Sequence, residues 1–203
     1  MKISVIILSY NNLQELNRLL ESLPLYKKKV EWIVVDNGTT SPYQLIPAVN
    51  LPVKWIHLEQ NQGIPGGFNA GIRASSGDWI VCLASDNVCS DPMEFPENTY
   101  RKGKVLVGPS MRSQHIQGVP GQYIEGWCFA FPRGLVKDIG YMDEYYVYCW
   151  EDVDWSIRAQ LAGYNLQQID CGIMNPDEQR MDDIPKYHDR NLDYLRRKFR
   201  LQP

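Results

Sequence analysis

Carboxylates follow an aromatic segment in the second half of the sequence. Glu151, Asp152 and Asp154 stand in the first turn of a predicted helix, directly after Tyr148 and Trp150. Acidic residues favour the N-terminus of a helix for electrostatic reasons alone, and this is the simpler explanation for Glu151. An Asp beside a Glu with apolar walls can also act as a general base that deprotonates a hydroxyl group. The preceding rings favour this second interpretation, because they would form a rim on which a sugar stacks.

A single carboxylate, Asp86, follows the apolar segment 79–84. A turn or helix cap would explain it. A carboxylate at the end of a buried strand also suits Mg²⁺ or Mn²⁺, since these ions take one or two protein carboxylates together with the phosphate oxygens of a substrate. The glycine-rich segment 60–71 is the entry to a predicted helix, where backbone N–H groups could approach a nucleotide, although it matches neither the Walker A loop nor GxGxxG.

Buried strands and amphipathic helices must alternate to position these residues. Continuous apolar runs predict strands, and apolar residues at helical spacing predict helices. In the first half the patterns predict strands over 3–8, 31–35, 53–58 and 79–84, and helices over 13–23 and 66–75. In the second half they predict a strand over 123–131 and helices over 135–139, 151–162 and 189–199, while residues 92–121 are expected to wrap the sheet edge. This alternation indicates an α/β fold with a mostly parallel central sheet flanked by helices.

Polar residues follow three of the predicted strands, at the point where each strand ends. In an open parallel sheet these carboxyl ends form the ligand crevice. Strands also end in turns that favour the same residue types, and a turn is the preferred explanation for any one cluster. Three clusters at one edge weaken that explanation. The clusters are Ser9-Tyr10-Asn11, Asp36-Asn37-Gly38 and Ser85-Asp86-Asn87.

The composition is that of one globular domain. The 203 residues include 21 Lys and Arg against 24 Asp and Glu, and the net charge of −3 leads us to expect no nucleic-acid partner. The sequence has neither an apolar run long enough for a transmembrane segment nor a signal-peptide cleavage site. Five scattered cysteines without metal-ligand spacing indicate reduced thiols, so we expect a cytoplasmic protein. The basic face of the last predicted helix leaves contact with a membrane surface open, but a solvated face is preferred.

Five segments, in order, resemble inverting glycosyltransferases of family 2 with the GT-A fold, and in particular their rhamnosyltransferase-like branch. Each motif alone has low specificity, whereas the five together cover about residues 3–165. They read VIILSYN (5–11), IVVDNGT (33–39), NQG with GGFNAG (61–71), LASD (83–86), and GYMDE with EDVD, RA and AGY (140–164). The resemblance implies a single GT-A domain over 1–203. Its nucleotide-sugar-binding half would be 1–90, and its acceptor-side half, with the C-terminal helix, would be 91–203.

The resemblance also implies a reaction. A hexosyl or deoxyhexosyl group would move from a nucleotide-diphosphate donor, a UDP- or dTDP-sugar, to an acceptor hydroxyl in one displacement that inverts configuration. Asp152 would be the general base and Glu151 a supporting acid that contacts the acceptor. Asp86 would hold Mn²⁺ or Mg²⁺ as the last residue of the family's DxD motif, stabilising the departing diphosphate. The acceptor side would include Trp127, Tyr148 and Trp150. The donor nucleotide would be held by Ser9, Tyr10, Asn11, Asp36, Asn61, Gly67, Asn69 and Ser85.

Two departures from the family pattern keep a second hypothesis open. The metal motif is reduced to Ala84-Ser85-Asp86, and Asn175 stands near the place where the family tends to have a metal-binding His. Asn175, or His188 folding back, would have to replace that ligand. The alternative function is a catalytically weak nucleotide-sugar-binding module that acts with a partner. A sugar-nucleotide pyrophosphorylase would need a GxGxR-like loop near the N-terminus, which residues 9–13 lack.

Overall fold

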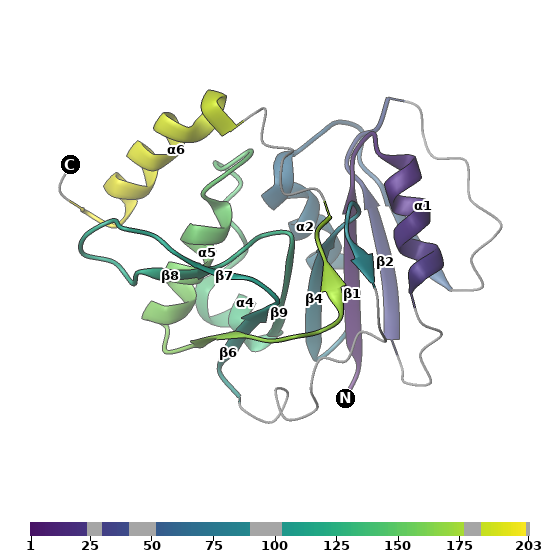
Figure 1. The fold of residues 1–203 in the computed structure, drawn as a ribbon, viewed down its shortest axis with the longest axis horizontal. Coiled ribbons are helices and arrows are strands. Elements are labelled where there is room, and N and C mark those ends of the chain that lie inside the picture. The colour runs from purple at the N-terminus through teal and green to yellow at the C-terminus, as the bar shows by residue number, and fades with distance from the viewer. Residues whose placement is uncertain (24–29, 41–51, 90–102, 177–183, 202–203) are drawn as a thin grey trace.

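The central element is a seven-stranded sheet. The computed structural model describes residues 1–23, 30–40, 52–89, 103–176 and 184–201. Neighbouring strands run parallel, except that β9 is antiparallel to both of its neighbours, β4 and β6 (Figure 1). The strand order is β10 (Asn165–Gln168), β6 (Val105–Gly108), β9 (Cys128–Pro132), β4 (Trp79–Ala84), β1 (Ile3–Ser9), β2 (Val30–Asp36) and β3 (Val53–His57).

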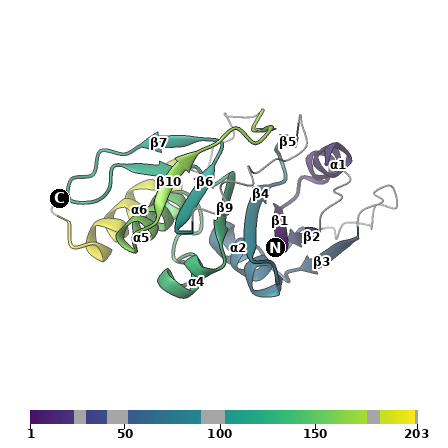
Figure 2. The ribbon, with the colours of Figure 1, turned by 90° about the horizontal axis from the view of Figure 1, so that it is seen from below.

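Helices cover both faces of this sheet (Figure 2). On one face, α1 (Leu13–Ser22) buries Leu16, Leu19 and Leu20, whose helical spacing places them together against β1 and β4. On the other face, Phe68, Ile72, Leu135 and Trp155 share a second core, to which they are brought by α2, α4 and α5. These helices are α2 (Gly63–Ala74), α4 (Gly134–Ile139) and α5 (Glu151–Leu161). The sheet is therefore the middle layer of three.

Smaller elements complete the second half. The strands β5 (Val88–Cys89) and β11 (Ile173–Met174) form one antiparallel pair, and β7 (Met111–Ser113) and β8 (Gln122–Ile124) form another. The last helix, α6 (Ile184–Lys198), packs on α5 through a third apolar cluster that includes Leu195 and Ile157. No helix in the described ranges is both long enough and apolar enough to cross a membrane.

The fold class is confirmed as α/β with a mostly parallel central sheet, and the strands and helices predicted for the first half are present. Two predictions for the second half are wrong. The predicted strand 123–131 is two strands, β8 and β9, separated by residues 125–127. Residues 105–108, within the segment expected to wrap the sheet edge, form the internal strand β6 between β10 and β9. The part of that segment from 92 to 102 lies outside the described residues.

Candidate functional site

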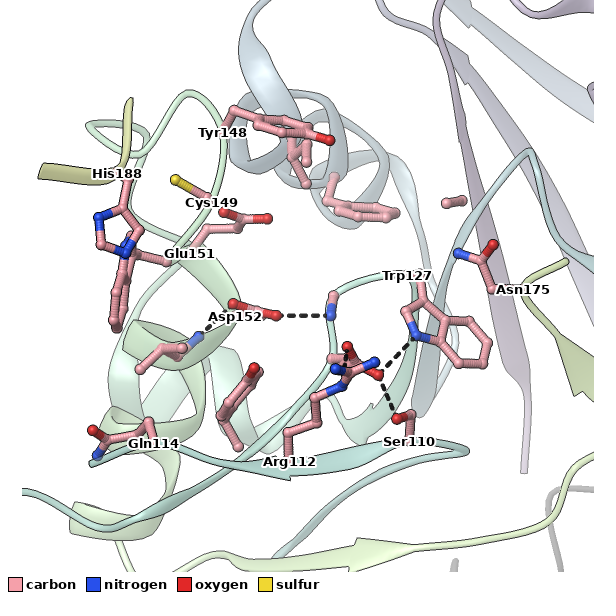
Figure 3. Close-up of a pocket in the computed structure, with 18 of the residues that line it drawn as sticks. Ser110, Arg112, Gln114, Trp127, Tyr148, Cys149, Glu151, Asp152, Asn175 and His188 are labelled. Atoms are coloured by element: carbon pink, nitrogen blue, oxygen red, sulfur yellow. Dashed lines mark hydrogen bonds and ion pairs between the residues drawn. The ribbon is translucent and has the colours of Figure 1, made fainter. Parts of the chain in front are cut away.

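A cavity of about 620 Å³ opens at the carboxyl ends of β1 and β4, between these strand ends, α2 and the loops of the second half. Leu8 and Asp86 reach it from the strand ends, and Ile64 and Phe68 reach it from the first turns of α2. The remaining walls are residues 110 and 112–115, 123 and 125–127, 148–153, 175 and 188 (Figure 3). A cavity of this size accommodates a small-molecule ligand.

Eight of the residues predicted to act in the site line this one cavity. They come from segments that are about one hundred residues apart in the sequence. The structure thus brings together the predicted base, its acidic neighbour, the three aromatic residues and all three candidate metal ligands. These residues are Asp86, Trp127, Tyr148, Trp150, Glu151, Asp152, Asn175 and His188.

Asp152 is held by two backbone N–H groups. The N–H of Gly126 donates to Oδ2 at 3.1 Å, and the N–H of Val153 donates to Oδ1 at 2.8 Å. Desolvation nevertheless raises the pKa of the Asp152 carboxyl to about 6, because these two hydrogen bonds only partly offset it. At neutral pH the group is ionised, and its basicity exceeds that of an ordinary aspartate. A carboxylate fixed in this way can accept a proton from a hydroxyl group.

Glu151 is the less usual member of the pair. It is 6% exposed, and its Oε2 atom has no hydrogen-bond partner among the described residues. Desolvation, followed by the charge of Asp152, raises the pKa of Glu151 to about 8. The two carboxyl groups therefore favour different protonation states at neutral pH, with Glu151 neutral and Asp152 ionised. Both side chains point into the cavity (Figure 3).

A polar group that the sequence patterns did not reveal supports one wall. Glu125 accepts hydrogen bonds from Ser110 Oγ and, at 3.3 Å, from Trp127 Nε1, and it pairs with Arg112 at 2.7 Å. It thereby fixes the indole of Trp127 at the edge of the cavity. The one available signal was Gly126, because a glycine inside an apparent strand indicates a break or a close backbone approach.

The three polar clusters after the strands do converge. Ser9 Oγ donates to Asn12 Oδ1 at 2.6 Å, and Asn12 Nδ2 donates to Ser85 Oγ at 2.7 Å, so the ends of β1 and β4 are bridged. The N–H of Asn11 donates to Thr39 Oγ1 at 3.1 Å, which joins the end of β1 to the residues after β2. These groups form a continuous polar edge beside the cavity, although they are absent from its lining.

Asp36 ends β2 and is 4% exposed. Its Oδ1 accepts the N–H of Thr39 at 3.1 Å, and its Oδ2 lies 2.9 Å from Nδ1 of His57 on β3. His57, which no sequence motif singled out, is thus the partner of Asp36. Tyr10, also expected at the donor site, is 42% exposed.

Three further residues expected at the donor nucleotide serve the packing around α2 and do not line the cavity. Asn61 Oδ1 accepts from Asn37 Nδ2 at 3.1 Å and from the N–H of Gly63. At Gly67 a Cβ atom would lie 2.3 Å from Leu8 Cδ1, so a side chain there would force Leu8 to move. Asn69 is fully buried; its Nδ2 donates to the carbonyl oxygen of Met142, and its Oδ1 accepts from the N–H of Met142.

The candidate metal ligands lie in two places. The register of β11 with β5 pairs Met174 with Val88, so Asn175 follows directly at the end that leads to Asp86. His188 lies on the opposite side of the cavity from Asn175, where its ring is 5.3 Å from that of Trp150 (Figure 3). Within the described ranges, no group of three or more His, Cys, Asp or Glu side chains could hold a metal ion. Asp86 and Asn175 thus remain the two candidate oxygen ligands, while His188 lies across the cavity from Asn175.

Comparisons with known proteins find similarity to glycosyltransferases. Residues 4–97 match the family model "Glycosyl transferase family 2". An uncharacterized glycosyltransferase of Haemophilus influenzae is 36% identical over 86 residues, covering 42% of this chain and 29% of that protein. Poly-beta-1,6-N-acetyl-D-glucosamine synthase of Staphylococcus aureus is 24% identical over 197 residues, covering 81% of this chain and 47% of the synthase. The chain thus spans less than half the length of these relatives.

A solved structure shares the fold. S. aureus TarS residues 1–349, in complex with UDP-GlcNAc, superposes with a TM-score of 0.61 at 20% identity, covering 83% of this chain and 56% of that one. The match to the glycosyl transferase family 2 model thus covers the first half of the sheet and its helices, and the solved structure shares the fold over most of the chain.

Proposed function

We propose that the protein transfers a sugar from a nucleotide-diphosphate donor to an acceptor hydroxyl, with inversion at the anomeric carbon. The observation that carries the proposal is the pair Glu151 and Asp152 on the wall of a cavity at the carboxyl edge of the sheet. Inversion by direct displacement needs one base aligned with the acceptor. Asp152 supplies it, and no second carboxylate is required as a nucleophile. The rhamnosyltransferase-like branch and a cytoplasmic location remain predictions from the sequence.

Asp152 is the general base of the proposed reaction. The N–H of Gly126 holds one carboxylate oxygen at 3.1 Å, which leaves the remaining lone pairs for the acceptor hydroxyl. As the acceptor oxygen bonds to the anomeric carbon, its proton passes to Asp152 and the bond to the diphosphate breaks. Glu151, in its neutral form, donates a hydrogen bond from its carboxyl O–H to the acceptor. The pair then carries one negative charge and not two, so its repulsion of the acceptor oxygen is smaller.

The donor nucleotide binds along the polar edge beside the cavity. Asp36 accepts from the base, while Ser9, Asn11 and Ser85 lie at the ends of β1 and β4 where the nucleoside and phosphates would run. Tyr10 is exposed enough to cover the base. The donor is proposed to be a UDP- or dTDP-sugar, in keeping with the UDP-GlcNAc held by TarS. Asn61, Gly67 and Asn69 then shape this site through the packing of α2.

A divalent ion, Mg²⁺ or Mn²⁺, suits Asp86 and Asn175. One carboxylate and one amide oxygen are hard ligands, and such an ion completes its shell with water and diphosphate oxygens. When bound, it would neutralise charge on the departing diphosphate. The residues of the chain provide the positioning: the diphosphate would lie at Asp86 and the acceptor near Asp152.

The acceptor is proposed to lie against Trp127, Tyr148 and Trp150. Their rings and indole or phenol groups can cover the apolar faces of a sugar and also hydrogen-bond to it. Glu125 fixes Trp127, and α6 approaches Trp150 through His188. The acceptor is accordingly expected to present a hydroxyl group on a flat, partly apolar ring.

Donor turnover tests the proposal. UDP release from UDP-GlcNAc and other UDP- and dTDP-sugars would be measured with Mn²⁺, with Mg²⁺ and with a chelator. Asp152→Asn should lower turnover by about 10²- to 10⁴-fold, the usual contribution of a general base, with UDP affinity unchanged. The matched control is Glu59→Gln, an exposed substitution outside the cavity. If wild-type protein binds UDP but turns over no donor, the weak nucleotide-sugar-binding module is the correct function instead.

A further inference from the structure

The turn that leads into α5 has an unfavourable backbone. Cys149 and Trp150 have φ angles of 59° and 70°, so two consecutive non-glycine residues adopt the left-handed region. Such residues cost free energy and persist only where the surroundings hold them in place. The turn immediately precedes Glu151 and Asp152, and both of its residues line the cavity. Whatever holds the turn therefore also orients the carboxyl pair.

A buried amide on α6, that of Asn191, contacts the backbone of the turn directly. It is fully buried, and its Nδ2 donates to the carbonyl oxygens of Tyr148 at 2.7 Å and Cys149 at 3.0 Å. Asn191 Oδ1 accepts hydrogen bonds from Nε and Nη2 of Arg190 at 3.1 and 2.9 Å. Arg190 Nη2 also donates to the carbonyl oxygen of Tyr145 at 3.2 Å. Two side chains of α6, Asn191 and Arg190, thus donate to backbone carbonyl groups in and before the turn.

We infer that Asn191 is a positioning residue, which holds the strained turn at 148–150 and so fixes the carboxyl pair and Trp150 for reaction. The inference rests on the proposed function for its catalytic part. Without Asn191 the carbonyl groups of Tyr148 and Cys149 lose the donor of two part-buried hydrogen bonds, and this loss is unfavourable. Cys149 and Trp150 can leave the left-handed region, which relieves the backbone strain and lets the carbonyl groups find other donors. Glu151 and Asp152 would then shift with the first turn of α5.

Other contacts keep α6 in place when Asn191 is changed. Leu195 is buried with Tyr146, Val153 and Ile157, and these residues form the cluster between α5 and α6. Lys198 Nζ lies 2.7 Å from Asp143 Oδ2 and 2.7 Å from Asp154 Oδ1. Substitution of Asn191 is therefore expected to loosen the turn while the helix stays docked.

Cys149 offers a probe of the turn that is independent of turnover. It is half-buried, and burial raises the pKa of its thiol to about 11, so alkylation of the folded protein should be slow. The other four cysteines are at most 7% exposed, which makes Cys149 the thiol whose labelling can be followed by peptide mass. An open turn brings the thiol into water and removes the desolvation that is the main cause of its raised pKa, which outweighs the lost hydrogen bond from Asn191 and speeds alkylation.

The test compares iodoacetamide labelling of Cys149 in wild-type protein, Asn191→Ala and Leu16→Ala. Leu16 is fully buried on α1, in the core on the other face of the sheet, so its substitution lowers global stability without touching the turn. Asn191→Ala should label Cys149 about tenfold faster, as two lost hydrogen bonds predict, while Leu16→Ala labels at the wild-type rate. Equal rates in wild type and Asn191→Ala, or an equal increase in Leu16→Ala, would overturn the inference.

Kinetics separate positioning from simple stability. With UDP-GlcNAc, or whichever donor wild-type protein turns over, Asn191→Ala should lower kcat and leave UDP affinity by calorimetry unchanged. Should Asn191→Ala fail to fold, Asn191→Asp keeps the shape but places a carboxylate oxygen against two carbonyls, and it should open the turn at least as much. Faster labelling of Cys149 without any wild-type turnover would reject the proposed function and leave the holding role of Asn191 intact. Unchanged kcat in a folded Asn191→Ala or Asn191→Asp protein rejects the positioning role.

Discussion

Replacing Glu151 with glutamine should make the protein more stable at neutral pH. The pKa of Glu151 is raised from 4.5 to about 8, first by desolvation and then by the charge of Asp152. Above pH 4.5 ionisation of this carboxyl lowers the free energy of the unfolded chain, whereas in the folded protein the carboxyl stays neutral up to about pH 8. The stability it contributes is therefore fully present below pH 4.5 and is lost as pH rises toward 8. The amide is neutral at every pH and avoids this loss.

The size of the effect follows from the same values. Each unit between the unfolded pKa and the working pH costs about 1.4 kcal/mol, so the carboxyl lowers the free energy of unfolding by about 3 kcal/mol at pH 7. Glu151→Gln should recover most of this, which corresponds to a rise in Tm of about 6 to 12 °C for a chain of this length. At pH 5 the two proteins should differ by less than about 1 kcal/mol.

The assay is urea unfolding of both proteins at pH 5, 6, 7 and 8, with thermal unfolding alongside. Glu59→Gln, an exposed change of the same chemistry, serves as the control and should follow the wild-type curve. Asp152, whose pKa is raised to about 6, adds a decline in the same direction between pH 4 and 6 in both proteins. A wild-type free energy of unfolding that stays level from pH 5 to 8, together with no gain in Glu151→Gln, would refute the buried neutral carboxyl.

Two further substitutions test the donor edge and the docking of α6. Asp36→Ala should weaken UDP binding about tenfold or more by calorimetry, because a nucleoside would lose a charged acceptor, and unchanged affinity would reject its donor role. Lys198→Met should lower the free energy of unfolding by about 3 kcal/mol, since the fully buried Asp154 loses one of its two cations and keeps only Arg158. Arg197→Met, an exposed change on the same helix, should have little effect, and equal losses in both variants would contradict the ion-pair explanation.

The sequence was sufficient for the first half of the fold because each element there repeats a simple rule. Buried parallel strands read as apolar runs, and α1 carries its leucines at helical spacing, so both could be located without tertiary information. The prediction of one strand over 123–131 was wrong for a local reason. The apolar and aromatic residues of this segment read as one strand, but the backbone breaks at Gly126 so that its N–H can reach Asp152 at 3.1 Å. The strand propensity of a residue depends on local sequence and does not reflect such a long-range contact.

Some residues of the candidate site could be predicted from the sequence, and others could not. Residue type and position next to a strand end or helix start identified the cavity residues Asp86 and Asp152, because those positions follow from the fold class. Partners supplied by distant segments could not be identified, and Glu125 and Asn191 are the two examples. The first acts through Trp127 and the second through the carbonyls of Tyr148 and Cys149. Gly126 hints at the first through a break in the strand, whereas the contacts of Asn191 leave no pattern in a single sequence.

The dependence of the turn at 148–150 on α6 has a consequence for biosynthesis. The sheet strands β1, β2 and β4 and the carboxyl pair are all translated before residues 184–198, so the chain can form its donor edge first. The turn acquires its buried donor only after α6 has left the ribosome and docked on α5. Until then Glu151 and Asp152 belong to an unanchored helix end. If the proposed function is correct, the nascent chain is therefore expected to bind a nucleotide before it can catalyse transfer.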